Sequence, residues 1–117
     1  MVDVVLAEDA DVQRSLLRQF VEQEHTIVGT TSTAAGAVQL VEDHDPDVVL
    51  MDINLEDSSG ITATASIRTF NESVVIIIST AYVDDEMIDD AFRSGADEYL
   101  VKPYSKETLL TTIDDFT

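Results

Sequence analysis

Residues 47–55 read Asp-Val-Val-Leu-Met-Asp-Ile-Asn-Leu, and this stretch decides the fold. Its four consecutive apolar residues, Val48–Met51, are followed directly by the carboxylate of Asp52. A short apolar run rich in β-branched residues is typical of a strand that is buried on both faces. Strands of this kind belong to parallel sheets covered by helices, in which ligands bind beyond the carboxyl ends of the strands. Asp52 is therefore a candidate site residue.

The same alternation continues on both sides of this stretch. Further strands are predicted at Val2–Ala7, Thr26–Gly29, Val74–Ser79 and Glu98–Val101. Apolar residues at near-helical spacing separate and follow them, namely Val12, Leu16, Phe20 and Val21; Ala34, Val38 and Val41; Ile61, Ala65 and Ile67; Met87, Ile88, Ala91 and Phe92; and Leu109, Leu110, Ile113 and Phe116. Five β-α repeats predict an α/β fold, a doubly wound five-stranded parallel sheet with five helices on its two faces.

Helix boundaries follow from capping residues. Ala10-Asp11 precedes the first helix, Ser32 or Thr33 the second and Asp84 or Asp85 the fourth, while the third opens after Gly60. Gly95 closes the fourth helix, and Ser105, with Thr108 three residues on, caps the fifth. With 117 residues and no visible linker, the chain is one domain, 1–117.

The charge excludes several functions. The chain carries 24 acidic and 6 basic residues, a formal net charge of −18. Binding to nucleic acid or to anionic lipid requires the opposite sign. The acids are spread along the chain, which favours a halophilic adaptation that keeps the surface hydrated over an acidic dock for a basic partner. The absence of cysteine excludes disulfides, thiolate metal sites and cysteine nucleophiles.

The sequence is expected to be cytoplasmic. Its longest apolar run, 74–78, is far shorter than the ~20 residues of a membrane-spanning helix. The start, Met1-Val2-Asp3, lacks the basic residues of a signal peptide.

Functional side chains gather at the predicted strand ends. Glu8 and Asp9 follow the first strand, Asp52 the third, Thr80 the fourth and Lys102 the fifth. Each residue alone is more often a cap, a turn or a surface charge. Together they place three carboxylates at one edge, where two charges ~4 Å apart repel by about 4 kcal/mol at an effective dielectric near 20.

Mg²⁺ would relieve this repulsion, because it prefers oxygen ligands and tolerates bound water and phosphate. Lys102 and Thr80 are then candidate partners of phosphate oxygens, and Asp52 is the candidate nucleophile, because aspartate can form an acyl phosphate.

These residues lie in segments that resemble the receiver domain of two-component response regulators. The resemblance rests on Val4-Val5-Leu6-Ala7-Glu8-Asp9, on Asp47–Leu55 with Gly60, on Ser79-Thr80-Ala81 and on Gly95–Tyr104, and it covers essentially the whole chain. It implies the flavodoxin-like strand order 2-1-3-4-5. It also implies a signalling domain that catalyses only its own phosphorylation and dephosphorylation.

The resemblance implies roles for individual residues. Asp52 would accept a phosphoryl group from a histidine kinase, a phosphotransfer protein or a small phosphodonor. Mg²⁺ would be held by Glu8 through water, by Asp9, by Asp52 and by the backbone carbonyl of Asn54. Lys102 would pair with the phosphoryl group, and the Lys102–Pro103 bond would be cis.

The resemblance also implies a switch. Thr80 would move toward the phosphoryl oxygen and Tyr99 would rotate inward behind it, which is a population shift. The surface of the fourth helix, fifth strand and fifth helix would then signal to a downstream protein target or a fused output domain. A monomer or a weak phosphorylation-dependent dimer is expected, since like charges oppose a strong self-interface at low salt.

Two departures from the family pattern stand out. Glu56 replaces the usual proline and is followed by Asp57, so the loop is more acidic and is expected to be looser. Tyr82 lies two residues after Thr80, where the family, together with the position of Asn54, tunes the lifetime of the phosphoryl group. A bulky Tyr82 is expected to screen attacking water and to lengthen that lifetime.

Two alternative functions fit the sequence less well. A Mg²⁺-dependent aspartyl-phosphate phosphatase typically needs a second acid two residues after the nucleophile, where Asn54 cannot serve, and it needs a substrate cap for which 117 residues leave little room. A degenerate receiver that acts as a phosphorylation-independent scaffold is disfavoured because all expected positions are intact. A stand-alone regulator is favoured over a fragment of a longer protein, because the sequence stops at the fifth helix.

Overall fold

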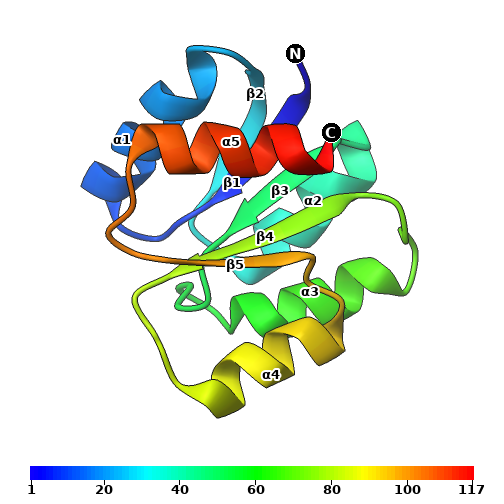
Figure 1. Cartoon of the computed structure of the whole chain (residues 1–117). Helices are drawn as coiled ribbons and strands as arrows, with labels where there is room; N and C mark the ends of the chain where they lie inside the picture. Colours follow the sequence, from blue (N-terminus) through cyan, green and yellow to red (C-terminus); the bar gives the residue numbers. More distant parts are fainter.

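The computed structural model describes residues 1–117 and shows five strands that alternate with five helices (Figure 1). The elements in chain order are β1 (Asp3–Ala7), α1 (Asp11–Glu22), β2 (Thr26–Thr31), α2 (Ala34–His44), β3 (Val48–Met51), α3 (Gly60–Arg68), β4 (Val75–Thr80), α4 (Asp85–Ser94), β5 (Glu98–Val101) and α5 (Lys106–Phe116). The predicted α/β class and the number of elements are confirmed. No helix has both the length and the apolar character needed to cross a membrane.

All strand pairs are parallel, and the sheet order is β2-β1-β3-β4-β5, as the resemblance implied. The central strand β3 is buried on both faces, and its Leu50 pairs with Leu6 of β1 and with Ile77 of β4. Ala7 lies opposite Met51 at the ends of their strands. This register brings the residues that follow β1 and β3 to one edge of the sheet.

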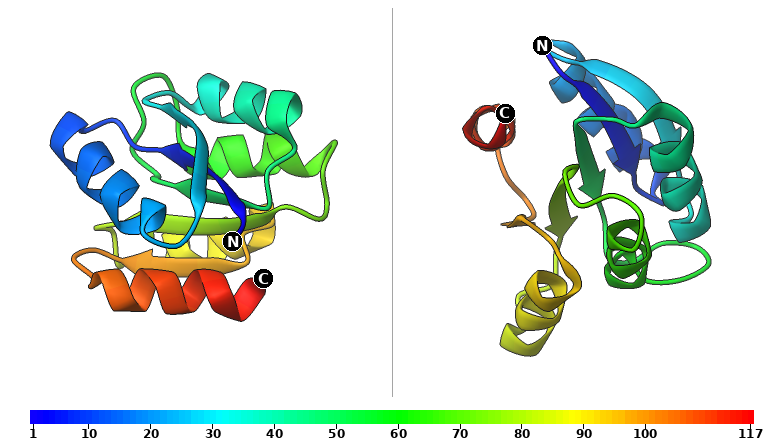
Figure 2. Two further views of the ribbon diagram at one scale, coloured as in Figure 1. Left: turned by 90° about the horizontal axis from the view of Figure 1, so that it is seen from above. Right: turned by 90° about the vertical axis from the view of Figure 1, so that its right-hand side faces the viewer.

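Two apolar layers hold the helices on the sheet. Figure 2 shows α5 on one side of the sheet and α2 and α3 on the other. Leu17 and Val21 of α1 and Leu109 and Ile113 of α5 belong to a cluster of nine buried residues on one face. A cluster of 16 buried residues on the opposite face includes side chains of α2, α3 and α4. Each fully buried Leu, Ile or Val stabilises the fold by about 1.5–3 kcal/mol.

The predicted buried face of α1 is partly wrong. Val12 is 82% exposed and Leu16 is 42% exposed, whereas Leu17 and Val21 are 4% and 0% exposed. Leu16 and Leu17 are neighbours in sequence, and each belongs to a different row of apolar residues at helical spacing. The rotation of the helix about its axis selects between the two stripes, and packing against α5 and the sheet sets that rotation.

Other predicted core positions are also exposed. Ala65 of α3 points to solvent, while Ala63, Thr64 and Ile67 form the buried face. Phe92 of α4 and Phe116 of α5 are 43% and 39% exposed.

Element ends lie within two residues of the prediction. β2 runs on to Thr31, β4 is shifted by one residue, and α3 begins at Gly60 after the N-cap Ser59. The side chains of Thr33 and Ser105 cap α2 and α5 as predicted. Asp84 and Ala10 occupy N-cap positions without a side-chain capping bond. Gly95 ends α4 at a φ of 114°, a left-handed conformation that favours glycine.

Candidate functional site

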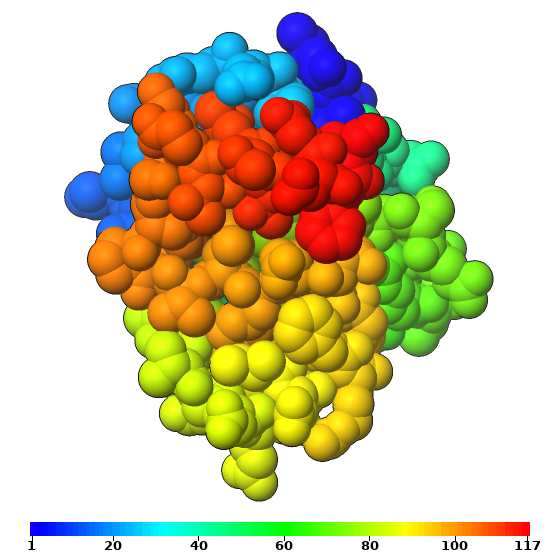
Figure 3. All heavy atoms as spheres, viewed as in Figure 1, coloured from blue at the N-terminus to red at the C-terminus, as the bar shows by residue number.

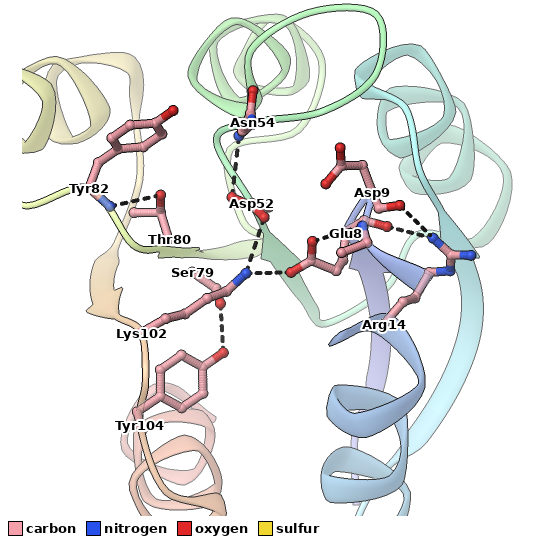
Figure 4. A network of polar contacts seen from close by, with 11 residues as sticks. Glu8, Asp9, Arg14, Asp52, Asn54, Ser79, Thr80, Tyr82, Lys102 and Tyr104 are labelled. Atoms are coloured by element: carbon pink, nitrogen blue, oxygen red, sulfur yellow. Dashed lines mark hydrogen bonds and ion pairs between the residues drawn. The ribbon is translucent and has the colours of Figure 1, made fainter. Parts of the chain in front are cut away.

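The predicted site residues meet at the carboxyl edge of the sheet (Figure 4). Backbone hydrogen bonds extend the sheet one residue past the strands, from the N–H of Asp52 to the carbonyl of Ala7 (2.9 Å) and from that of Lys102 to Thr80 (2.8 Å). These bonds fix where the Asp52 and Lys102 side chains leave the backbone. Thr80 is the last residue of β4 rather than the first one after it.

Lys102 lies between two carboxylates. Its Nζ donates to Oε1 of Glu8 and to Oδ2 of Asp52, the latter at 3.1 Å. Glu8 is 2% exposed and Asp52 is 8% exposed, so solvent screens these charges poorly. One ammonium group cannot balance two nearly buried carboxylates, and the site retains an excess negative charge.

The pKa values of the buried pair reflect this imbalance. Burial by itself would lower the pKa of Lys102, but the neighbouring Glu8 and Asp52 carboxylates outweigh it and raise the pKa, so Lys102 stays protonated. Burial raises the pKa of Glu8, and the nearby Asp52 raises it further against the opposing effect of Lys102. Glu8 therefore lies where additional positive charge is favourable.

The carboxylates of Glu8, Asp9 and Asp52 can form a metal site. Each contributes an oxygen, and these oxygens lie within 4.8 Å of one another. The backbone N–H of Asn54 donates to Oδ1 of Asp52 at 3.2 Å, which places the backbone of Asn54 beside the cluster. An all-oxygen set with an open, half-exposed side at Asp9 suits Mg²⁺, a hard cation that keeps some of its water. The residues present therefore fit this ion.

Thr80 and Tyr99 are joined through the backbone of Tyr82. Oγ1 of Thr80 accepts from the N–H of Tyr82 (3.3 Å), and the Tyr99 hydroxyl donates to the carbonyl of Tyr82 (2.8 Å). Burial, together with the negative charge of Asp84, raises the pKa of the Tyr99 hydroxyl, which keeps it a donor. The side chain of Tyr82 is 42% exposed.

The sequence did not reveal two groups that support the site. One is the pair of hydroxyls of Ser79 and Tyr104, which share a hydrogen bond of 2.6 Å beside Lys102. The neighbouring Lys102–Pro103 bond is cis, which the resemblance had implied. Arg14 donates to the carbonyls of Glu8 (2.8 Å) and Asp9 (3.5 Å) and so holds the β1–α1 loop. The sequence signal that could have indicated a role for Arg14 is its position three residues after Asp11, with which it forms an ion pair.

The loop between β3 and α3 is held by hydrogen bonds. This differs from the looser loop predicted from Glu56, which stands where the family usually has proline. Asp57 accepts from the backbone N–H groups of Ala34 (2.6 Å) and Ala35 (3.1 Å) at the start of α2. The N–H of Glu56 donates to the carbonyl of Ser32 (3.1 Å). The acidic residue that follows the missing proline therefore supplies a tether of its own.

Known proteins are similar to this chain over most of its length. The family model "Response regulator receiver domain" matches residues 4–114. The chain is 35% identical to the chemotaxis protein CheY of Halobacterium salinarum over 96% of this chain and 93% of that protein. It is 33% identical to the transcriptional regulatory protein YdfI of Bacillus subtilis over 97% of this chain but 54% of YdfI.

A solved structure also matches closely. A DNA-binding response regulator of the LuxR family from Staphylococcus aureus superposes with a TM-score of 0.94 at 26% identity, covering 99% of this chain and 98% of that chain. The sheet order, the acidic edge with its lysine and these matches agree, and the chain belongs to the response regulator receiver family of two-component signalling.

Proposed function

We propose that Asp52 accepts a phosphoryl group in a Mg²⁺-dependent reaction, and that this changes the surface formed by α4, β5 and α5. The observation that supports this most is the placement of the Asp52 carboxylate. One oxygen is bound by the N–H of Asn54, the other lies 3.1 Å from Lys102, and the carboxylates of Glu8 and Asp9 lie nearby.

The transfer forms one bond and breaks one. A carboxylate oxygen of Asp52 attacks phosphorus, and the bond from phosphorus to the donor breaks, with its electron pair leaving on the donor atom. That atom is an imidazole nitrogen of a histidine kinase or phosphotransfer protein, which then takes up a proton, or an oxygen of acetyl phosphate. Lys102 offers its ammonium charge to the incoming phosphoryl oxygens.

Four groups would hold Mg²⁺: the carboxylates of Glu8, Asp9 and Asp52 and the backbone carbonyl of Asn54. When bound, the ion supplies positive charge to the phosphoryl oxygens during the transfer. Burial and the nearby Asp52 raise the pKa of Glu8, so this added positive charge would favour its ionised form.

The switch begins at Thr80. Its Oγ1 accepts from the N–H of Tyr82, and its O–H would donate to a phosphoryl oxygen on Asp52, which would draw Thr80 and the attached loop toward that oxygen. The carbonyl of Tyr82 is bound by the Tyr99 hydroxyl, so movement of this loop reaches β5 through two hydrogen bonds. The phosphorylated form shifts the population only if Thr80 and Tyr99 interact better with it in the active arrangement.

The surface that changes lies at one end of the sheet. Figure 3 shows α4, the β5 region and α5 as one continuous face. Phe92 and Val101 are 43% and 39% exposed on α4 and β5. These groups offer apolar contacts to a downstream protein target or a fused output domain. Repulsion between like charges opposes a strong self-interface at low salt, so the domain is a monomer or a weak phosphorylation-dependent dimer.

The cellular setting forms part of the proposal. A net charge of −18 suits a cytoplasm rich in salt, where counterions screen the repulsion between surface carboxylates. The same charge opposes any contact of this domain with nucleic acid.

The mass of the intact protein after incubation with acetyl phosphate and Mg²⁺ in high-salt buffer tests the reaction. We expect one phosphoryl adduct on the parent, and none on Asp52→Asn or after chelation. Asp115→Asn, which removes an exposed carboxylate on α5, is the matched control and should be phosphorylated like the parent. A folded parent that takes no phosphoryl group from acetyl phosphate or from a phosphohistidine donor would contradict the proposal.

A further inference from the structure

Asp57 is exposed, yet its carboxylate is fully engaged. Its two oxygens accept from the first two backbone N–H groups of α2, at 2.6 Å from Ala34 and 3.1 Å from Ala35. These N–H groups have no partner within their own helix. The helix's own cap, Thr33, accepts from Gly36, which leaves both groups to Asp57.

The helix that Asp57 holds is a firm anchor. α2 has no acidic residue in its first turn, so the carboxylate of Asp57 is the one that faces the positive end of its dipole. Ala34, Ala37 and Val41 of α2 are buried in the larger apolar cluster. A loop tied to this helix is therefore tied to the core.

The β3–α3 loop, which Asp57 ties to α2, contains Asn54, whose backbone lies beside the candidate metal site. Between Asp52 and Asp57, the N–H of Asn54 bonds to the Asp52 carboxylate, and Asn54 forms a bridge with Ser59. The N–H of Glu56 reaches the carbonyl of Ser32 beside α2. The contact of Asp57 with α2 thus completes a short loop whose two ends are fixed, with Asn54 between them.

We propose that Asp57 is a positioning residue for the Mg²⁺ site: it ties the β3–α3 loop to the start of α2 and so holds the Asn54 carbonyl in place before the ion binds. This inference rests on the proposed function. A loop ordered in advance loses less conformational freedom when the ion binds, and the affinity is higher for that reason. Without the tether, the ion has to order the loop itself.

Three variants separate this effect from that of charge. Asp57→Ala removes the capping oxygens and one negative charge. Asp57→Asn removes the charge and keeps one of the two acceptor oxygens, because the other is replaced by an amide nitrogen that cannot accept. Glu56→Ala removes one negative charge from the neighbouring exposed position and leaves the cap intact.

The measurement is the Mg²⁺ dissociation constant, from NMR titration with MgCl₂ at constant high ionic strength. We expect Asp57→Ala to weaken binding about fivefold, as the loss of a helix cap would suggest, with Asp57→Asn between Asp57→Ala and the parent and Glu56→Ala within about twofold of the parent. Amide hydrogen exchange at Ala34 and Ala35 should accelerate most in Asp57→Ala and should not change in Glu56→Ala. Far-UV circular dichroism checks that each variant is folded.

Two results would overturn the inference alone: a parent that binds Mg²⁺ with Asp57→Ala unchanged, or Glu56→Ala weakened as much as Asp57→Ala, which would show a charge effect. A folded parent that binds no Mg²⁺ would overturn both the proposed function and this inference. The parent titration therefore distinguishes the two failures.

Discussion

At the residue scale, Lys102 controls the charge balance of the site. It is one of only two lysines in a chain of net charge −18, and it faces both Glu8 and Asp52. In the absence of an ion it provides the positive charge that these carboxylates need. In the proposed function it would compete with Mg²⁺ for the same oxygens and would also serve the incoming phosphoryl group.

Replacing Lys102 separates these two roles. We expect Lys102→Gln to bind Mg²⁺ about tenfold more tightly, because the competing ammonium charge is gone, and to take up phosphate from acetyl phosphate more slowly. Lys106→Gln, which changes the other lysine, is the control. Equal Mg²⁺ affinities for the two variants, from titration at fixed ionic strength, would show that Lys102 does not compete with the ion.

Tyr82 tests the expected control of lifetime. Its backbone N–H donates to Thr80 and its carbonyl accepts from Tyr99, so Tyr82 is tied to both predicted switch residues, while its side chain is 42% exposed. We expect Tyr82→Ala to lose the phosphoryl group about threefold faster, a change of ~0.65 kcal/mol in the barrier, with Tyr82→Phe close to the parent. Dephosphorylation of Tyr82→Ala no faster than the parent's, followed by intact mass, would refute this role.

Asp57 gives a pH dependence with a definite sign. The N–H groups of Ala34 and Ala35 lower the pKa of its carboxyl. A lowered pKa contributes stability above the unfolded pKa and loses it as the pH falls through the folded value, below about pH 4. The stability difference between the parent and Asp57→Asn, from urea unfolding, should therefore shrink from pH 6 to pH 3. A difference that is constant across this range would argue against the cap.

At the element scale, Arg68 joins the end of α3 to two neighbouring loops. Its guanidinium donates to the carbonyls of Gly95 (2.9 Å), Asn71 (3.2 Å) and Val74 (2.7 Å), and it pairs with Asp97 at 2.9 Å. No local sequence pattern predicts this role, because the partners of Arg68 follow different elements. The planar fork of arginine matches several acceptors at once, which lysine cannot do.

Arg68→Lys tests this junction. We expect a loss of about 1–3 kcal/mol in the free energy of unfolding, because several carbonyls lose their donors. Arg93→Lys is the matched control, since Arg93 is 73% exposed and pairs only within its own helix. Urea unfolding of both variants at the same salt concentration provides the comparison. An equal loss in the two variants would mean that Arg68 acts only as a surface charge.

The helices also show which features the spacing of apolar residues can predict. Spacing located all five helices, and the residues around their starts placed those starts within about one residue, while Gly95 placed the end of α4. It did not select the buried stripe of α1, where Leu17 is buried and Leu16 is exposed. Burial faces depend on the rotation of the helix against its neighbours, and adjacent stripes of similar hydropathy leave that rotation undetermined.

At the scale of the whole molecule, net charge and fold act against each other. Folding gathers 24 acidic residues into a body with a radius of gyration of 12.4 Å, and their repulsion opposes it. The Debye length falls from ~10 Å at 0.1 M salt to ~3 Å at 1 M. Screening by salt should therefore stabilise the folded chain.

The free energy of unfolding in urea is expected to rise between 0.1 M and 2 M KCl, because added ions reduce repulsion in the compact state more than in the extended chain. Sorbitol at matched osmolality controls for effects of solvent exclusion. A free energy that stays level or falls with KCl would contradict the halophilic interpretation of the charge.

The sequence by itself determined the alternation of strands and helices and the strand ends at which Glu8, Asp52, Thr80 and Lys102 lie. These depend on local periodicity and on the rule that parallel strands end at one edge. The resemblance supplied the strand order.

Only the tertiary structure decided which side chains touch. Lys102 and Glu8 are 94 residues apart in sequence, and Asp57 and Ala34 are 23 apart. Such contacts depend on how helices and loops pack in three dimensions, on rotations and shifts of a few ångströms that no local pattern encodes.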